Sequence, residues 1–229
     1  RSNNAAGESR AFRWTAGGEA GGEAGGMQDL GTLPLPFSLY SEARGVSADG
    51  SVVVGWSGPG EHEHAFRWTA ATGMVGLGYT GPTHAHSEAR GISRDGNTIV
   101  GWSRDFLTGN TDAFTWTPSG GMQVLPGIPG HTSPAALAVS GDASFIVGSD
   151  LSGALMWTPT GVQELGVPSG WSYSGADHVS DDGLVVLGSL VSGARGVDAV
   201  WTPSTGFVPF LDYLSLNGIS VPAGYTIRD

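Results

Sequence analysis

The pair Trp-Thr occurs five times in this 229-residue chain, and similar sequence surrounds each copy. The five tryptophans are Trp14, Trp68, Trp116, Trp157 and Trp201. Successive copies are 54, 48, 41 and 44 residues apart. Self-similarity at this spacing is typical of proteins built from repeated supersecondary units, among them the four-stranded blades of β-propellers. The repeat therefore constrains the fold more than any single motif does.

One copy of the repeat, from Glu42 to Gly78, divides into four short strands. Its Asp49-Gly50 pair is a typical hairpin sequence, since such a pair supplies the positive φ angles of a tight turn. A second turn separates the last two strands. The sequence predicts strands from Ala43 to Ser47, Ser51 to Ser57, His64 to Thr69 and Met74 to Gly78. Four serines recur once per repeat, which is typical of a structural role: Ser47, Ser93, Ser140 and Ser180.

The second strand of this copy is apolar on both faces, which indicates burial between two layers. Stacked propeller blades bury both faces of each sheet in this way. The alternative is a β-solenoid, although one solenoid coil usually takes far fewer residues than these repeats. We therefore predict an all-β fold, a β-propeller of four-stranded blades. It would have five blades, with the fifth split between the two ends of the chain.

The whole chain, residues 1–229, is predicted to form one propeller domain. The repeat units are expected at residues 1–33, 40–78, 86–127, 133–167 and 174–211. An apolar segment that ends at Asn217-Gly218 predicts a short helix with a glycine C-cap, over 209–218. Residues 219–229 resemble the start of a closing repeat. The Gly-Glu-Ala-rich segment over 17–26 predicts a long exposed loop.

The charge of the chain disfavours several classes of partner. Its formal net charge is −11 and all ten basic residues are arginine, so we expect no nucleic-acid partner. No apolar run reaches the roughly 18 residues that span a bilayer, so we expect no direct membrane insertion of this segment. The absence of cysteine excludes disulfides and thiol catalysis. No cofactor is expected.

Three segments together resemble one known family. They are ARGVSADGSVVVG, HAFRWT and GMVGLG, all within the copy that begins at Glu42. Over nearly its whole length the chain resembles the HAF family of extracellular repeats, named for the tripeptide at His64, Ala65 and Phe66. The resemblance implies a secreted or surface-attached bacterial protein, often of the autotransporter type, with neighbouring repeats of a longer chain as partners. It implies no catalytic residues, because the family has no agreed activity.

The long connections of the repeat predict a binding face. If the strands of a blade alternate in direction, the connections after the second and fourth strands share one face. These connections are long and varied, and variable loops on a rigid scaffold often carry binding residues. Their aromatic and polar side chains would suit sugar rings; alternatively, they only fill the gaps between loops. The predicted binding residues are Tyr40, Tyr79, His84, His86, Phe106, His131, Trp171 and Tyr173.

Two His-x-His pairs raise the question of a metal site. They are His62 with His64 and His84 with His86. In an extended segment each pair would place both imidazoles on one side, as a metal site requires. Neither pair has an obvious third ligand in the sequence. We interpret them as exposed loop histidines and predict no metal site.

One position of the first strand carries a charge in three repeats, at Arg44, Arg90 and Asp177. If the first strand is innermost, these side chains line the central channel. Glu42 and Glu88 stand two residues before the arginines, which predicts a salt-bridged lining. Paired acids could instead serve glycoside chemistry.

These observations predict a secreted or cell-surface propeller that acts as a binding or adhesion module, with a glycan or surface polymer as its partner. One alternative is an extracellular hydrolase or lyase that degrades a polymer. Its acids would be among Glu42, Glu88, Asp177 and His84 or His86. The other alternative is a passive structural spacer in a surface assembly.

Overall fold

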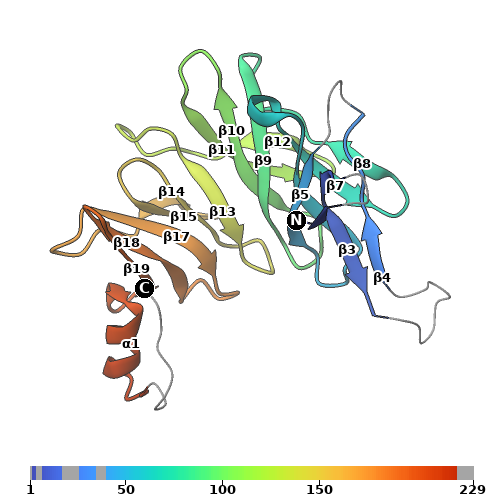
Figure 1. Ribbon diagram of the computed structural model, residues 1–229. Coiled ribbons are helices and arrows are strands. Elements are labelled where there is room, and N and C mark those ends of the chain that lie inside the picture. The colour runs from blue at the N-terminus through green and yellow to red at the C-terminus, as the bar shows by residue number, and fades with distance from the viewer. Residues whose placement is uncertain (1, 4–6, 17–25, 35–39, 221–229) are drawn as a thin grey trace. The chain divides into compact units, whose positions relative to one another are not determined.

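The computed structural model describes residues 2–3, 7–16, 26–34 and 40–220 (Figure 1). The chain divides into two compact units, Arg1–Val124 and Leu125–Asp229. In the described part of both units, almost all regular structure is antiparallel β-sheet. The assignment of the whole chain to one domain stays a prediction.

The first unit contains two complete four-stranded sheets, in which each strand pairs with the strands before and after it in the chain. The first sheet consists of β5 (Ser41–Val46), β6 (Val52–Ser57), β7 (His64–Thr69) and β8 (Gly73–Gly76), with the short helix η1 (Gly60–His62) before β7. The second sheet consists of β9 (His84–Ile92), β10 (Ile99–Asp105), β11 (Thr111–Thr117) and β12 (Gly121–Val124).

Four further short strands in this unit represent the N-terminal copy of the repeat. They are β1 (Ser2–Asn3), β2 (Ser9–Arg10), β3 (Phe12–Thr15) and β4 (Gly26–Asp29). β1 pairs with β2, and β3 pairs with β4. The pairing of Ser2 with Arg10 corresponds to that of Ser57 with His64 in the next copy. β1 therefore stands where a second strand ends.

The described part of the second unit contains two more four-stranded sheets of the same topology and one helix. The first sheet consists of β13 (Ala135–Val139), β14 (Ile146–Ser149), β15 (Ala154–Thr158) and β16 (Gly161–Glu164). The second consists of β17 (Tyr173–Val179), β18 (Val186–Ser192), β19 (Arg195–Thr202) and β20 (Gly206–Pro209), followed by α1 (Phe210–Leu216). No helix in the described part of the chain has the length and apolar character needed to cross a membrane.

The observed strands confirm the predicted division of the repeat. β7 has the predicted bounds, and β5, β6 and β8 differ by one or two residues at their ends. The predicted short helix is also confirmed, and Gly218 follows it with a φ of +69°. The predicted exposed loop lies outside the described residues except for Gly26. Most of the predicted closing repeat, 221–229, lies outside them too.

Both faces of the central strands are buried, as predicted. Between the sheets β5–β8 and β9–β12, a cluster of buried residues includes Val54, Ile99 and Phe114, each without exposed surface. In the second unit a similar cluster, with Leu190 and Val186 fully buried, joins the sheets β13–β16 and β17–β20. Because burial of an apolar side chain contributes roughly 1.5 to 3 kcal/mol, stacking of neighbouring sheets stabilises each unit.

In three of the four complete sheets, a buried serine near the start of the first strand bonds to the repeat before it. Ser87 Oγ accepts a hydrogen bond from the Ala65 N–H (3.0 Å) and donates one to the Gly78 carbonyl (2.9 Å). The same two bonds recur at Ser41 and Ser174, and all three serines are at most 1% exposed. One hydroxyl thus satisfies two buried backbone groups that would otherwise destabilise the junction. The repeat of β13–β16 has Pro134 at this position, which has no hydroxyl.

The turn between the first and second strands has a second repeated serine. Ser47 Oγ donates to Asp49 Oδ1 (2.6 Å) and accepts from the Val52 N–H (3.0 Å). Ser93, Ser140 and Ser180 make the corresponding bonds, which confirms that these serines are structural. Of the Asp-Gly pair, Gly50 has a positive φ (+70°) but Asp49 does not. The expectation that the pair supplies positive φ angles therefore holds only for the glycine, because the aspartate serves as a hydrogen-bond acceptor.

A bulge distorts the first strand of all four complete sheets. In β5 the register shifts between Ala43 and Gly45, so that Arg44 is an extra residue. The bulge brings the Glu42 carbonyl so close to β6 that a Cβ on Gly55 would lie 1.9 Å from its oxygen. Gly101, Gly148 and Gly188 stand in the same position, with a carbonyl oxygen 1.9 to 2.0 Å from the Cβ site. The repeated glycine of the second strand is therefore a packing requirement of the bulge.

The third copy of the serine-aspartate turn predicts a stabilising substitution. Ala143 stands where the other copies have glycine, with a φ of +64° that strains an L-residue. Ala143→Gly should raise the free energy of unfolding by about 0.5 to 1 kcal/mol. The reverse change, Gly50→Ala, meets no atom within 4 Å and should lower it by about 1 kcal/mol through φ alone. Urea unfolding of both variants measures these changes. If both substitutions raised, or both lowered, the free energy of unfolding, the strain argument would be contradicted.

The same turns predict loss of stability in acid. Hydrogen bonds from Ser47 and Ser51 lower the Asp49 pKa from 3.8 to about 2, and bonds from Ser144 and Ser140 do the same for Asp142. Because the folded-state pKa is the lower one, this contribution is complete above the unfolded pKa and is lost as the pH falls toward 2. The melting temperature should fall between pH 4 and about 2, less steeply in Asp49→Asn. A melting temperature that is flat over this range would contradict the prediction.

Candidate functional site

His84 and His86 lie on one strand, β9, but on opposite faces of its sheet. His86 pairs with Arg104 and His84 with the next residue, Asp105, so Ala85 is an extra residue. Because side chains alternate along a strand, this second bulge of β9 turns His84 away from His86. The prediction that the two imidazoles share one side is wrong, and its cause is the bulge.

The His84 and His86 side chains are only 8% and 16% exposed. Their interpretation as exposed loop histidines is therefore wrong. In the other pair, His62 is exposed on η1, but His64 begins β7 and is half-buried. Burial and the nearby His62 and His86 lower the pKa of His64. The predicted binding residue Tyr79 places its hydroxyl 2.6 Å from His64 Nε2.

His86 lies between two carboxylates. Its Nε2 is 3.0 Å from Glu63 Oε2 and 3.6 Å from Glu88 Oε1, and its ring is tilted against Trp102 with a centroid distance of 4.7 Å. Burial lowers the pKa of His86, but the two glutamates outweigh it and raise the value to about 9. The other oxygen of Glu88, Oε2, pairs with Arg90 at 3.1 Å. Sequence reasoning missed Glu63, because it precedes β7 and so belongs to a different sheet from His86.

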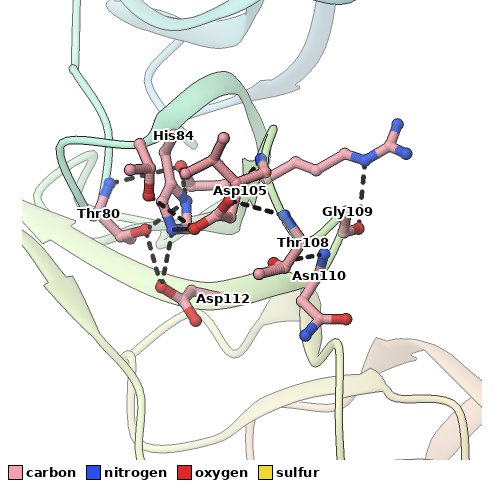
Figure 2. Close-up of polar contacts among 11 residues, drawn as sticks. Thr80, His84, Asp105, Thr108, Gly109, Asn110 and Asp112 are labelled. Carbon is pink, nitrogen blue, oxygen red and sulfur yellow. Dashed lines mark hydrogen bonds and ion pairs between the residues drawn. The ribbon is translucent and has the colours of Figure 1, made fainter.

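His84 is the centre of a separate polar network (Figure 2). Its Nδ1 lies 3.0 Å from the hydroxyls of Thr80 and Ser103, and its Nε2 lies 3.5 Å from Asp112 Oδ2. Ser103, His84 and Asp112 have the composition of a catalytic triad. However, Ser103 has no exposed surface, so no substrate can reach its hydroxyl. The network instead fixes the connection that leads into β9.

A loop held by several hydrogen bonds follows β10 and exposes two apolar side chains. Asp105 Oδ1 accepts the N–H groups of Leu107 (2.7 Å) and Thr108 (3.1 Å), while Oδ2 accepts the Thr83 hydroxyl (2.6 Å). Bonds from Thr83 and from the Thr108 and Leu107 amides hold the Asp105 pKa below its ordinary value. Phe106 and Leu107, at the tip of this loop, are 68% and 67% exposed. The backbone is thus ordered while the large side chains face solvent.

A pocket of about 300 Å³ lies beside this loop in the first unit. This volume is at the lower end of the range for small-ligand sites. Its lining combines an aromatic ring, a guanidinium and imidazoles: His62, Ala85, His86, Arg104 and Phe106. The extra residue of the β9 bulge, Ala85, forms part of the wall. Two of the predicted binding residues, His86 and Phe106, therefore meet at one pocket.

The remaining predicted binding residues lie elsewhere. Tyr40 precedes β5 and is 46% exposed. In the second unit, His131 Nδ1 lies 2.5 Å from Asp150 and its Nε2 lies 3.2 Å from Glu164. Trp171 packs against the core of that unit, and the Arg195 guanidinium lies 4.7 Å from its ring centroid. Trp171 thus fits the alternative that loop rings fill space. Tyr173 begins β17, where it pairs with Val191.

The predicted channel residues Arg44, Arg90 and Asp177 are each the extra residue of a first-strand bulge. The expected ion pairs are confirmed for both arginines: Arg44 lies 2.9 Å from Glu42, and Arg90 lies 3.1 Å from Glu88. Asp177 is exposed. The channel-lining role of these three residues stays a prediction.

Comparisons with known proteins bear on the fold. The sequence matches no family model and no curated relative. Two TolB-type propellers share its fold: TolB from Acinetobacter baumannii, with a TM-score of 0.54, and a TolB-type protein from Agrobacterium tumefaciens, with 0.55. Their identities are 17% and 15%. The matches cover 80% and 81% of this chain, but 45% and 69% of those proteins. Together with the four complete sheets and the N-terminal copy of the repeat, they confirm the prediction of an all-β propeller with five blades. The two matches themselves show the fold alone.

The ordered loop after β10 predicts a local effect of Asp105. Asp105→Ala removes the acceptor of the Leu107 and Thr108 amides, so both should exchange their hydrogens faster with solvent. Asp112→Ala is the matched control, because Asp112 bonds to Thr80 and not to these two amides. Hydrogen exchange followed by NMR measures both variants. Equal protection of the two amides in Asp105→Ala and wild type would contradict this account of the loop.

Proposed function

We propose that the protein is a glycan-binding module of the cell exterior and that its ligand enters the pocket beside Phe106. The observation that carries this proposal is the meeting of an exposed aromatic ring with Arg104 and His86 at one pocket. A sugar ring can stack its apolar face on Phe106. The guanidinium and imidazole then supply donors for its hydroxyl groups.

The hydrogen bonds that hold the loop after β10 support ligand binding at the pocket beside Phe106. The side chain of Asp105 and the Thr83 carbonyl already fix the backbone on both sides of Phe106. A ligand therefore does not have to order this segment, and the entropic cost of association is smaller. The resemblance of the repeats to HAF extracellular repeats supports a secreted or surface location. Display of many copies would add avidity to a weak single site.

A single aromatic side chain tests the proposal. Phe106→Ala should weaken binding of oligosaccharides about fivefold or more, because loss of a stacked ring costs about 1 kcal/mol or more. Leu107→Ala is the matched control, since Leu107 is equally exposed but does not line the pocket. A glycan array, followed by calorimetric titration of each ligand found, measures wild type and both variants.

The outcomes separate the competing functions. Binding that survives Phe106→Ala but is lost in Trp171→Ala or Tyr173→Ala would move the site to the second unit. Loss of viscosity of a polysaccharide solution under the wild-type protein would favour the hydrolase or lyase, with Glu42, Glu88 and Asp177 as the acids to replace. If the protein neither binds a glycan nor lowers the viscosity, the structural-spacer function is favoured.

A further inference from the structure

The cluster of Glu63, His86 and Glu88 has a second property that glycan binding does not require. Each residue offers one ligand atom, and the three atoms lie within 4.8 Å of one another. We propose that these three residues bind a divalent transition-metal ion, with zinc as the best match, at the wall of the pocket. The proposal does not depend on the glycan.

The spacing of the ligand atoms fits one ion. His86 Nε2 lies 3.0 Å from Glu63 Oε2 and 3.6 Å from Glu88 Oε1. Zinc binds nitrogen and oxygen ligands at about 2.0 to 2.2 Å, so two ligands of a tetrahedral site are roughly 3.3 Å apart. The two observed distances bracket this value. Small rotations of the glutamate side chains would bring both oxygens to the ion.

The donor set also fits a transition metal. One imidazole and two carboxylates are ligands of zinc and manganese, whereas calcium prefers oxygen ligands alone. His86 Nε2 is buried and has no hydrogen-bond partner of good geometry, although two carboxylates are near. The side chains of Glu63, His86 and Glu88 are 14%, 16% and 11% exposed. An ion at this point would contact the nitrogen and one oxygen of each glutamate.

Neighbouring residues orient the cluster. Arg90 holds Glu88 Oε2 at 3.1 Å, which leaves Oε1 directed toward His86. Such support of a ligand by a neighbouring side chain is usual in metal sites, and its loss commonly costs tenfold or more in affinity. Three protein ligands leave a further coordination position, which is typical of zinc sites that are open to a water molecule or a ligand. His86 also lines the pocket, so that position has access from solvent.

The second unit has a similar cluster of one imidazole and two carboxylates that should not bind an ion. Its carboxylates contact opposite nitrogens of one imidazole: Asp150 lies at His131 Nδ1 and Glu164 at Nε2. The two carboxylates therefore do not converge on a shared nitrogen. His131→Gln is consequently the matched control for His86→Gln.

The experiment is calorimetric titration of the chelator-treated full chain with zinc, manganese and calcium chlorides. Zinc should bind with one-to-one stoichiometry. His86→Gln and Glu63→Gln should weaken it about tenfold or more, while His131→Gln should change the affinity less than about twofold. Melting curves with chelator show whether each variant is folded. In the wild type, the His86 Nε2 NMR signal should shift on addition of zinc, which tests the site without any variant.

Three results would overturn the proposal. They are the absence of zinc binding by the wild type, binding that His86→Gln leaves unchanged, and a His86 Nε2 signal that zinc does not move. In those cases the cluster is a protonated imidazole paired with two carboxylates. Zinc binding without any glycan binding would support the metal site and contradict the proposed glycan-binding function. Glycan binding by a protein that binds no zinc would support the proposed function and contradict the metal site.

Discussion

The close contact between the first and second strands is the constraint on which the rest of each sheet depends. The bulge of the first strand presses a carbonyl oxygen into the second strand, where a Cβ on Gly55 or its counterparts would lie 1.9 to 2.0 Å away. The glycine must therefore recur in each complete sheet. The extra residue of the bulge leaves the pairing, and in three copies it carries the charge of Arg44, Arg90 or Asp177. The bulge thus explains why glycine recurs in the second strand of each complete sheet. It also places the three recurrent charges at the extra residue of the first strand.

Much of the fold could be predicted from the sequence, because it follows from local patterns. The Trp-Thr spacing indicates the blades, and the turn sequences between apolar segments indicate the strands. The Asn217-Gly218 pair indicates the end of the helix. Bulges could not be predicted in this way. The first strands show no clear alternation of polar and apolar residues that an inserted residue would interrupt, and Ala85 resembles any other strand residue. The strict alternation assumed for His84 and His86 failed at that residue.

The candidate site was predicted only in part, because its residues come from different repeats. Phe106 and His86 stood out as chemistry-bearing side chains in irregular segments, and they do meet at a pocket. Glu63 was missed, since nothing in the spacing of the sequence connects it with His86, 23 positions later. Its role arises only when the sheets β5–β8 and β9–β12 stack. Conversely, the four recurrent turn serines were predicted to be structural from their regularity, and they are structural, since each hydroxyl accepts a hydrogen bond from a backbone N–H of its turn.

The buried serines at the sheet junctions have a consequence for how such a chain can change its length. In the described part of the chain, the hydrogen bonds of the Ser41, Ser87 and Ser174 hydroxyls go to backbone groups of the repeat directly before them. Each serine lies within the first strand of its own repeat or at its boundary. A duplicated repeat would therefore bring along the hydroxyl that attaches it to its predecessor. Gain or loss of a whole repeat that carries this serine therefore needs no new residue at the junction, because the attaching hydroxyl belongs to the added repeat itself.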